Sequence, residues 1–290
     1  MELLNHSHIL AALPIETQQR LAHLDILDTV DSTNRYMYSH TDTAVPWACL
    51  AEYQTAGRGR HGRQWVSPYA SGLCLSIKHH YTTLDKPMTG LGIALAVSVV
   101  QVLHDLGATE VGLKWPNDIL WRGHKLAGLL LETRWNKDCE VIIGIGINVK
   151  IPSPDTTITQ PWVDLYTVLG HSISRNVLAA KLIDQCYKTL ILYPSQGLIT
   201  FWPQWQRFDL SYGQQVTLKI PFHKNKNREI IANSNSQKMV QPKPNTISTC
   251  QEGRFITGTA WGIDEQGALL LQVGSQRRRY ICGEVSLRIE

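Results

Sequence analysis

The 290-residue chain is long enough for one large domain and one small domain. Its composition, 43% hydrophobic and 18% charged, is that of a soluble globular protein, and the mild net charge of +4 argues against a broad surface for polyanions. The most apolar stretch, Leu91 to Leu103, is too short and too often interrupted by polar residues to span a bilayer.

The cysteines lie scattered, without the close spacing of a metal-binding or redox pair. We therefore expect reduced thiols rather than a disulfide framework. The N-terminal residues lack the basic segment of a signal peptide. The sequence thus predicts a cytoplasmic protein. The cysteines are Cys49, Cys74, Cys139, Cys186, Cys250 and Cys282.

The N-terminal part of the chain predicts a strand that leads into a helix. Before it, Leu10 to Leu24 could form one amphipathic helix or two short turns. Leu24 to Val30 shows the rough alternation of a strand. It ends at Asp31-Ser32-Thr33-Asn34, four residues that favour a helix N-terminus. Such a junction can bind anions at a sheet edge, although taken alone it favours an ordinary N-cap.

The next strand, Trp47 to Tyr53, leads through Gln54 into a glycine-arginine loop, which comprises Gly57 to Trp65. Its glycines permit unusual backbone angles and close approach to a ligand. Its arginines offer permanently charged, planar donors that match carboxylates and phosphates. The run therefore favours a mobile loop that closes over an anion. A solvated charged loop and an RGG-like nucleic-acid segment are the alternatives.

The middle of the chain combines a strand with a buried helix. Leu73 to His79 predicts the strand. Pro87 to Leu106 is apolar on nearly every side, which is typical of a buried helix. Pro87 suits its start and Gly107 its C-terminal cap. We expect this helix to be purely structural.

A proline interrupts the predicted strand from Val111 to Leu120. The interrupting segment, Lys114 to Asp118, is called the Lys-Trp-Pro-Asn-Asp turn below. Because proline cannot donate a ladder hydrogen bond, the strand must break here and present a lysine, an asparagine and an aspartate. Lys125-Leu126-Ala127-Gly128 follows and opens another strand, Leu129 to Trp135.

Val141 to Val149 predicts a further strand that contains Gly144-Ile145-Gly146-Ile147-Asn148. Glycines weaken a strand unless something lies against its backbone. No helix start and no third glycine follow at dinucleotide-binding spacing, which argues against a Rossmann turn.

The C-terminal third changes from helical to β patterning. Asp164 to Trp205 is helical, most clearly over Asn176 to Tyr193. The following short strands predict a small barrel, and the Asn/Ser/Lys-rich segment at about 223–251 a flexible insertion. We therefore divide the chain into a catalytic domain, 1–207, and a C-terminal domain, 208–290. The predicted strands are Gln215 to Ile220, Gly253 to Ile263, Ala268 to Val273 and Arg279 to Cys282, with a turn at Asp264 to Gly267.

The order of these motifs resembles the biotin protein ligases, or biotin–[acetyl-CoA-carboxylase] ligases, of the type that lacks an N-terminal DNA-binding domain. The glycine-arginine loop together with the Lys-Trp-Pro-Asn-Asp turn is the specific part of the resemblance, which extends from about Asp25 to the C-terminus apart from the insertion. The other matching segments are Ser32-Thr33-Asn34, Ala51 to Gln54, Lys125 to Gly128, Gly144 to Asn148, Gly258 to Leu271 and Gly283 to Arg288.

The resemblance implies an α+β fold: a mixed β-sheet with flanking helices, related to class II aminoacyl-tRNA synthetases, followed by an SH3-like β-barrel. It implies that biotin attacks the α-phosphate of Mg·ATP, giving biotinyl-5′-AMP and pyrophosphate. A lysine of a biotin carboxyl carrier domain then takes the biotinyl group. ATP, biotin and Mg²⁺ are the implied ligands, and the Mg²⁺ ligands are not assigned. We expect a monomer or weak homodimer without nucleic-acid or membrane partners.

The first step joins two anions, so it needs cationic side chains around them. By resemblance, Lys125, Arg58 and Arg60 are catalytic, although an arbitrary lysine here would be a surface residue. Ser32, Thr33 and Gln54 suit the ureido ring, which needs donors and acceptors in a dry pocket. The implied biotin-binding set is Ser32, Thr33, Asn34, Gln54, Gly57, Arg58, Arg60, Lys125, Gly128 and Gly144.

The implied ATP-binding residues are less sharply defined. Trp65 fits near the adenine, a core tryptophan being the alternative. Asn117, Asp118 and Asn148 could contact ATP, its Mg²⁺ or the incoming lysine, and their roles are not separated. Glu284 and Arg288, in the predicted C-terminal domain, could equally form a surface salt bridge. The set is Arg60, Arg63, Trp65, Lys114, Asn117, Asp118, Lys125, Asn148, Glu284 and Arg288.

Three alternatives accompany this hypothesis. A lipoate protein ligase shares the fold, but its ligand lacks a ureido ring and favours a more apolar pocket. A DNA-binding regulator needs a basic recognition helix, and only about two dozen residues precede the first strand. A module that merely holds biotin would not need Lys125 or the loop arginines.

Overall fold

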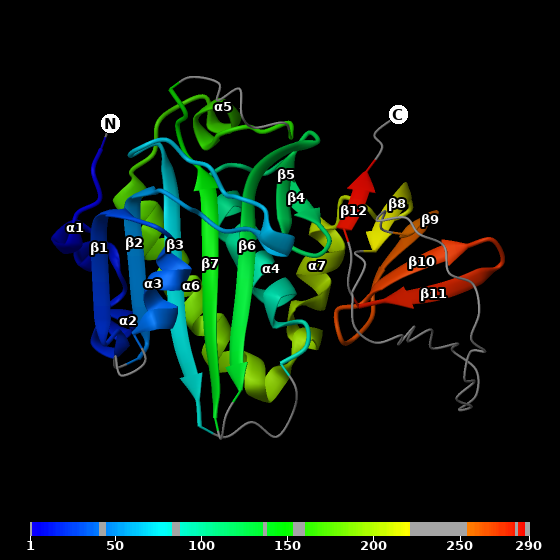
Figure 1. Cartoon of the computed structure of the whole chain (residues 1–290), viewed down its shortest axis with the longest axis horizontal. Helices are drawn as coiled ribbons and strands as arrows, with labels where there is room; N and C mark the ends of the chain where they lie inside the picture. Colours follow the sequence, from blue (N-terminus) through cyan, green and yellow to red (C-terminus); the bar gives the residue numbers. More distant parts are fainter. Residues whose placement is uncertain are drawn as a thin grey trace.

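Two β-sheets, one of seven strands and one of five, organise this computed structural model (Figure 1). The structure describes residues 2–40, 45–82, 88–135, 138–152, 160–220, 254–281 and 284–287. The larger sheet contains β1 (His23–Val30), β2 (Trp47–Gln54), β3 (Gly72–Tyr81), β4 (Val111–Lys114), β5 (Asp118–Trp121), β6 (His124–Trp135) and β7 (Cys139–Asn148). The smaller sheet contains β8 (Gln215–Ile220), β9 (Arg254–Ile263), β10 (Leu269–Val273), β11 (Gln276–Tyr280) and β12 (Glu284–Leu287).

Helices flank the larger sheet. They are α1 (His6–Ala12), α2 (Ile15–Arg20), α3 (Thr33–Ser39), α4 (Leu91–Asp105), α5 (Leu165–Leu169), α6 (Arg175–Gln196) and α7 (Trp202–Phe208), with 3₁₀ turns η1 (Arg60–Gly62) and η2 (Leu198–Phe201). No helix of the described residues combines the length and apolarity needed to cross a membrane.

The larger sheet is mixed, in the order β1-β2-β3-β7-β6-β5-β4. Only β1 and β2 are parallel, and the other neighbouring pairs are antiparallel. The smaller sheet has the order β11-β10-β9-β8-β12 and is antiparallel throughout. This architecture confirms the predicted fold class.

The strands in the middle of the larger sheet bury both faces. Leu50 and Ile145 point into the main core, together with residues of α4 and α6. Their sequence neighbours on the strands point to the opposite face, where Cys49 packs with Met37 of α3. Figure 1 shows α3 in front of the sheet and α4 behind it. The face that carries α3 also carries the candidate site.

The smaller sheet packs against the larger one through shared apolar residues. Leu218 and Leu269 belong to the same core cluster as the strands of the larger sheet. The indole nitrogen of Trp115 donates a hydrogen bond to the carbonyl oxygen of Gly267, 3.0 Å away. The proposed boundary at 207/208 falls at the end of α7, and the domain division stays a prediction.

Several predicted element boundaries are wrong. In place of one helix or two turns, the N-terminal segment forms α1 and α2, because Pro14 disfavours helical geometry in the residue before it. The helix predicted from Pro87 begins at Leu91, after Gly90 with φ 83°, and Pro87 lies outside the described residues. Its predicted C-terminal cap is confirmed, because Gly107 has φ 101°.

Observed strand boundaries differ from the predicted ones where pairing with a neighbouring strand decides them. The strand predicted from Leu129 begins at His124, which pairs with Trp121 of β5. The strand predicted over Arg279 to Cys282 is observed as β11, which begins earlier, at Gln276, because a tight turn pairs Val273 with Gln276. β12 was not predicted as a strand, and the predicted insertion at 223–251 lies outside the described residues. The cysteines in the described part, Cys49, Cys74, Cys139 and Cys186, are free thiols, as predicted.

Candidate functional site

A cavity of about 100 Å³, called the central cavity below, opens on the face of the larger sheet that carries α3. It collects predicted site residues from segments that are far apart in the sequence. Those that line it are Ser32, Thr33, Asn34, Gln54, Arg58, Arg60, Arg63, Trp65, Asn117, Lys125, Gly128 and Gly144. Gln64, Cys74 and Gln160 also line it and were not predicted.

Neutral polar groups at the start of α3 form one side of the central cavity. Gln54 Oε1 accepts hydrogen bonds from the backbone nitrogen and the hydroxyl of Thr33, at 2.8 and 3.1 Å. The Ser76 hydroxyl lies 2.7 Å from the Thr33 hydroxyl and 2.6 Å from Asn34 Oδ1. Ser32 occupies the N-cap position, but its side chain makes no capping hydrogen bond. These buried groups can offer both donors and acceptors to a ligand.

Two glycines of β7 allow side chains to lie directly on the strand. A Cβ at Gly144 would lie 2.4 Å from Asn34 Oδ1, and a Cβ at Gly146 would lie 2.4 Å from the Trp65 ring. Real Cβ atoms do not come so close, so a larger residue at either position would force Asn34 or Trp65 to shift. The sequence predicted that something must lie against this strand, and the structure identifies Asn34 and Trp65.

The glycine-arginine loop folds back on itself as a small hairpin. The backbone nitrogen of Trp65 donates to the carbonyl oxygen of Gly57 at 2.9 Å, and that of Gly59 donates to the carbonyl oxygen of Arg63 at 2.7 Å. The tip is η1, where His61 has φ 55°. The segment is therefore a loop, as predicted, and its tip is a single 3₁₀ turn. The backbone pairing of the loop's own residues closes the 3₁₀ turn.

Side-chain hydrogen bonds join the glycine-arginine loop to the rest of the site. Arg58 pairs with Glu132 of β6, Nη2 to Oε1, at 2.9 Å. Arg60 Nη1 donates to Asn117 Oδ1 at 3.3 Å, and Asn117 Nδ2 donates to the carbonyl oxygen of Leu129 at 2.7 Å. The two motifs that carry the family resemblance therefore meet in space.

Glu132 was not predicted, although the sequence contained a signal for it. Gly128 and Leu130 line the central cavity from β6. Because side chains alternate along a strand, Glu132 points to the same face. A carboxylate at that position is therefore placed to meet an arginine that reaches over the cavity.

Lys125 is held by the Lys-Trp-Pro-Asn-Asp turn. Its Nζ lies 2.7 Å from Asp118 Oδ1, and Lys114 Nζ lies 3.0 Å from Asp118 Oδ2. Burial alone would raise the pKa of Asp118, but the charges and hydrogen bonds of both lysines outweigh it and lower the pKa. The ionised carboxylate leaves this triad with one net positive charge beside the cavity.

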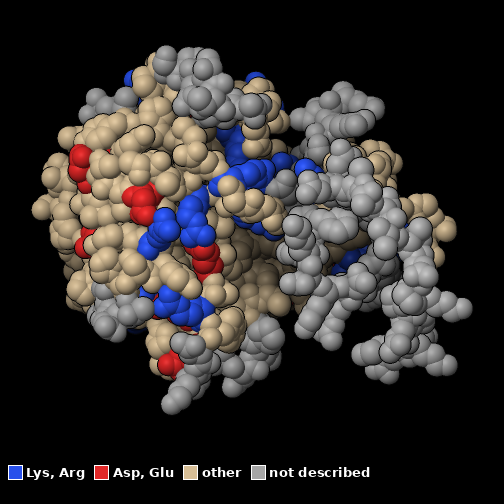
Figure 2. Space-filling model, in the orientation of Figure 1, with Lys and Arg blue, Asp and Glu red and all other residues tan. Residues whose placement is uncertain are grey.

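Cationic side chains dominate this face of the molecule. Figure 2 shows a band of Lys and Arg side chains across it, with few Asp and Glu beside them. Lys125 Nζ also lies 5.8 Å from the centre of the Trp65 ring. An anion entering the central cavity would therefore meet fixed positive charge on one side and neutral polar groups on the other.

Some predicted residues lie away from the cavity lining. Lys114 and Asp118 lie behind Lys125. Asn148 donates from Nδ2 to the backbone carbonyl oxygens of Lys125 and Val163, at 3.3 and 3.1 Å. Gly57 forms the base of the loop, where a Cβ would lie 2.3 Å from the Trp65 carbonyl oxygen.

The C-terminal pair of the predicted ATP site is only partly described. The backbone of Glu284 pairs with Lys219 in β8. The side chain of Glu284 and the whole of Arg288 lie outside the described part of the chain. Their assignment, like the other residue roles, stays a prediction.

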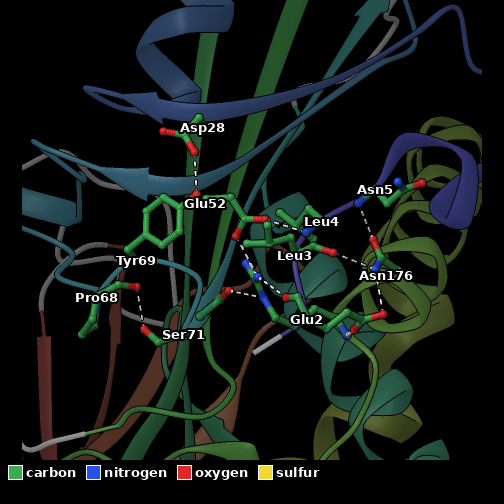
Figure 3. A network of polar contacts seen from close by, with 12 residues as sticks. Glu2, Leu3, Leu4, Asn5, Asp28, Glu52, Pro68, Tyr69, Ser71 and Asn176 are labelled. Atoms are coloured by element: carbon green, nitrogen blue, oxygen red, sulfur yellow. Dashed lines mark hydrogen bonds and ion pairs between the residues drawn. The ribbon is translucent and has the colours of Figure 1, made fainter.

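A buried ion pair supports the cavity from behind β2. Glu52 Oε2 lies 2.7 Å from Arg175 Nη1, and Leu4 N donates to Glu52 Oε1 at 2.5 Å. Figure 3 shows Glu52 facing the N-terminal segment, with Asn176 bonded to Glu2 nearby. Glu52 precedes Gln54 by two residues, so this network anchors the strand end that delivers Gln54.

A second cavity of about 520 Å³ lies between the two sheets. Trp115 and Pro116 line it from the Lys-Trp-Pro-Asn-Asp turn, and Gln266 lines it from the smaller sheet. Arg60 and Asn117 line both cavities. The tip of the glycine-arginine loop therefore stands where the two cavities meet.

Known families match most of this architecture. Residues 26–148 match the Biotin/lipoate A/B protein ligase family, and residues 246–288 match the Biotin protein ligase C terminal domain. The first match contains every predicted residue that lines the central cavity.

Individual relatives align over nearly the whole chain. The bifunctional ligase/repressor BirA of Salmonella typhimurium is 33% identical over 287 residues, covering 97% of this chain and 79% of BirA. The biotin–[acetyl-CoA-carboxylase] ligase of Mycobacterium tuberculosis is 28% identical, covering 90% of this chain and 88% of that ligase. The structure of a biotin protein ligase from Aquifex aeolicus, in complex with biotin and ATP, superposes with a TM-score of 0.72 at 26% identity, covering 92% of this chain and 99% of that one.

Proposed function

The chain belongs to the biotin protein ligase family, and we propose that its central cavity joins biotin to a protein lysine in two steps. In the first step, the biotin carboxylate attacks the α-phosphorus of ATP, and pyrophosphate leaves. In the second, a neutral lysine amine attacks the carbonyl carbon of biotinyl-5′-AMP, the amine loses a proton, and AMP leaves. The first step forms the bond between the carboxylate oxygen and the α-phosphorus and breaks the bond from that phosphorus to pyrophosphate. The second forms the N–C bond, breaks the C–O bond to AMP and releases the amine proton to water.

The convergence of two kinds of surface on one cavity carries this proposal. Ser32, Thr33 and Gln54 line the cavity with neutral donors and acceptors, which suit a ureido ring. Lys125 and the loop arginines supply positive charge, which suits the carboxylate at the other end of biotin. A lipoyl group has no ring that would use the polar side, so this arrangement favours biotin over lipoate.

We propose that Lys125 and Arg58 neutralise negative charge during the first step. The first step brings a carboxylate to a phosphate, so the site must neutralise charge that accumulates as the new bond forms. Asp118 holds the Lys125 amine at the cavity before any ligand arrives. Removing one such preorganised group typically costs about 10²–10³-fold in rate. A module that only stored biotin would have no use for this arrangement.

Arg60, Arg63 and Trp65 complete the proposed nucleotide contacts. All three line the central cavity from the glycine-arginine loop. We propose that the arginines contact phosphate oxygens and that Trp65 lies near the adenine. The same loop then covers the adenylate and limits its hydrolysis, as closing loops do in other enzymes.

Mg²⁺ enters this reaction bound to ATP as part of the substrate. In the described residues, no three His, Cys, Asp or Glu side chains come together as a metal site. Asp118 is already paired with two lysines. Mg²⁺ commonly binds through phosphates and water with only one or two carboxylates. We therefore propose that triphosphate oxygens and water supply most of the ligands of Mg²⁺.

The biological setting extends the proposal. We propose a biotin carboxyl carrier domain, such as that of acetyl-CoA carboxylase, as the acceptor. The cytoplasmic location, the monomeric or weakly dimeric state and the absence of nucleic-acid and membrane partners stay predictions of the sequence.

Biotin-dependent exchange of labelled pyrophosphate into ATP tests the first step. We expect exchange with biotin and little with lipoic acid, and a loss of about 10²-fold or more in Lys125→Ala. Lys188→Ala is the matched control, because the Lys188 side chain is 55% exposed and pairs with Asp184 on α6, outside the cavity lining. Exchange that depends on lipoic acid, or no exchange with either acid, would overturn the proposal.

A further inference from the structure

Glu132 connects the glycine-arginine loop to the start of α3. Its Oε1 lies 2.9 Å from Arg58 Nη2, and its Oε2 accepts from Arg58 Nη1 at 3.2 Å. The same Oε2 accepts from Asn34 Nδ2 at 3.0 Å. One carboxylate therefore binds a residue of the loop and a residue of the α3 N-terminus.

This carboxylate acts from outside the central cavity. Arg58 and Asn34 both line the cavity, whereas Glu132 is not among the described residues that line it. The Glu132 side chain is 22% exposed and that of Arg58 46% exposed, so the pair lies at the rim. A bidentate arginine–carboxylate pair fixes the guanidinium plane as well as its position.

The partners of Glu132 are themselves held in place. Asn34 lies against Gly144 of β7, and its Oδ1 accepts from the Ser76 hydroxyl. The polar chain therefore runs from β3 through Asn34 and Glu132 to Arg58. Glu132 of β6 therefore orients Arg58 over the cavity.

We propose that Glu132 is a positioning residue that keeps the glycine-arginine loop closed and thereby retains biotinyl-5′-AMP between the two steps. This inference rests on the proposed function, since it concerns the intermediate of that reaction. Glu132 contacts Arg58 rather than the reacting atoms, so its loss affects release of the adenylate more than its formation.

Positioning and simple electrostatics predict opposite results. Glu132→Gln removes one negative charge beside a site for an anion. If charge alone mattered, the adenylate would be held more tightly. If Glu132 orients Arg58, the bidentate pair is lost and the adenylate leaves faster. The direction of the change therefore separates the two roles.

The experiment uses the full chain loaded with biotin and Mg·ATP in a single turnover. After rapid dilution into excess unlabelled biotin and ATP, the loss of protein-bound labelled biotinyl-5′-AMP gives its release rate. We expect Glu132→Gln to release the adenylate about tenfold faster, as the loss of one charge-assisted pair implies. We expect the rate of adenylate formation to change by less than threefold or so.

Two further variants make the result specific. Glu110→Gln breaks the arginine pair of Glu110 with Arg122, both exposed and remote from the cavity, and should release the adenylate at the wild-type rate. Arg58→Ala combined with Glu132→Gln should release it no faster than Arg58→Ala alone, because Glu132 acts through Arg58. Equal urea midpoints for Glu132→Gln and the wild type would show that the fold is intact.

Unchanged or slower release in Glu132→Gln would overturn the inference, and so would additive effects in the double variant. If the wild type forms no adenylate, the proposed function fails instead. The two failures are distinguishable because wild-type adenylate formation is measured first.

Discussion

The Asp118 carboxylate lies 2.7 Å from the Lys125 amine and 3.0 Å from the Lys114 amine. Asp118 begins β5 and Lys125 follows the turn into β6, so two neighbouring strands place these groups side by side. The amine that lines the central cavity is therefore held by a buried counter-charge before any substrate binds.

Replacing Asp118 should slow adenylate formation without removing any group that lines the cavity. In Asp118→Asn, Lys125 loses its ionic partner and can move away, and a displacement of about 1 Å can cost about 10²-fold in rate. Single-turnover kinetics should show this loss. Glu110→Gln, which breaks an exposed pair with Arg122, is the control. A normal rate in Asp118→Asn would show that Lys125 does not need this partner.

The pH dependence of stability should also identify Asp118. Its pKa in the folded protein lies below the ordinary value of 3.8, because the lysine charges outweigh burial. A depressed pKa means that its contribution is complete above the unfolded value and is lost as the pH falls through the folded one. Urea unfolding should give a constant difference between the wild type and Asp118→Asn from about pH 8 to about pH 5. A difference that shrinks within this range would contradict the lowered pKa.

Gly144→Ala should weaken biotin binding. The added Cβ would lie 2.4 Å from Asn34 Oδ1, so Asn34 must move and its bonds to Ser76 and Glu132 are disturbed. We expect at least about a tenfold weaker Kd for biotin by calorimetry, since overpacking costs about 1–3 kcal/mol.

Gly92→Ala is the matched control for that change. Its Cβ would meet Leu131 at an ordinary 3.7 Å, and alanine favours the helix α4. It should therefore bind biotin normally and melt at the same temperature or higher. Normal biotin binding by Gly144→Ala would show that the Asn34 contact with β7 is dispensable.

The ion pair behind β2 should be important for stability. The side chains of Arg175 and Glu52 are 3% and 6% exposed, so removing one charge leaves the other buried. Arg175→Met should lower the free energy of unfolding by about 3–5 kcal/mol. In the double variant Glu52→Leu/Arg175→Met the loss should be smaller, because no buried charge remains. Urea unfolding measures both, and a double variant less stable than Arg175→Met would refute the explanation.

Buried thiols should resist alkylation in the native protein. Burial raises the pKa of Cys74 and of Cys186 to about 12. At about pH 8 only about one thiol in 10⁴ would be ionised, and the thiolate is the reactive form. Peptide mapping after iodoacetamide treatment should find both unmodified in buffer and modified in urea. Rapid native labelling of Cys74, which lines the central cavity, would reveal that the cavity opens to solvent.

Much of the fold was predictable because its signals are local. The rough alternation over Leu24 to Val30 and the apolar run over Leu91 to Leu103 each identify their own element. The boundaries at Leu91 and His124 were not predictable in the same way. The first depends on the left-handed conformation of Gly90, and the second on pairing with Trp121 across a turn.

The sequence predicted which residues form the candidate site, but not which of their side chains pair with one another. Ser32, Gln54, Arg58 and Lys125 were all named from their motifs, and all line the central cavity. Asp118 was named for ATP or the acceptor amine, yet the structure shows it bonded to two lysines. Side-chain pairing across strands depends on register, which a motif does not specify.

The sequence by itself determined most of the strands and helices and which side chains can carry charge toward an anion, because both follow from the covalent chemistry of neighbouring residues. The tertiary structure alone decided that Glu132 meets Arg58 and Asn34. The reason is that 74 residues separate Glu132 from Arg58, and only the strand order β3-β7-β6 brings α3, the glycine-arginine loop and β6 around one cavity.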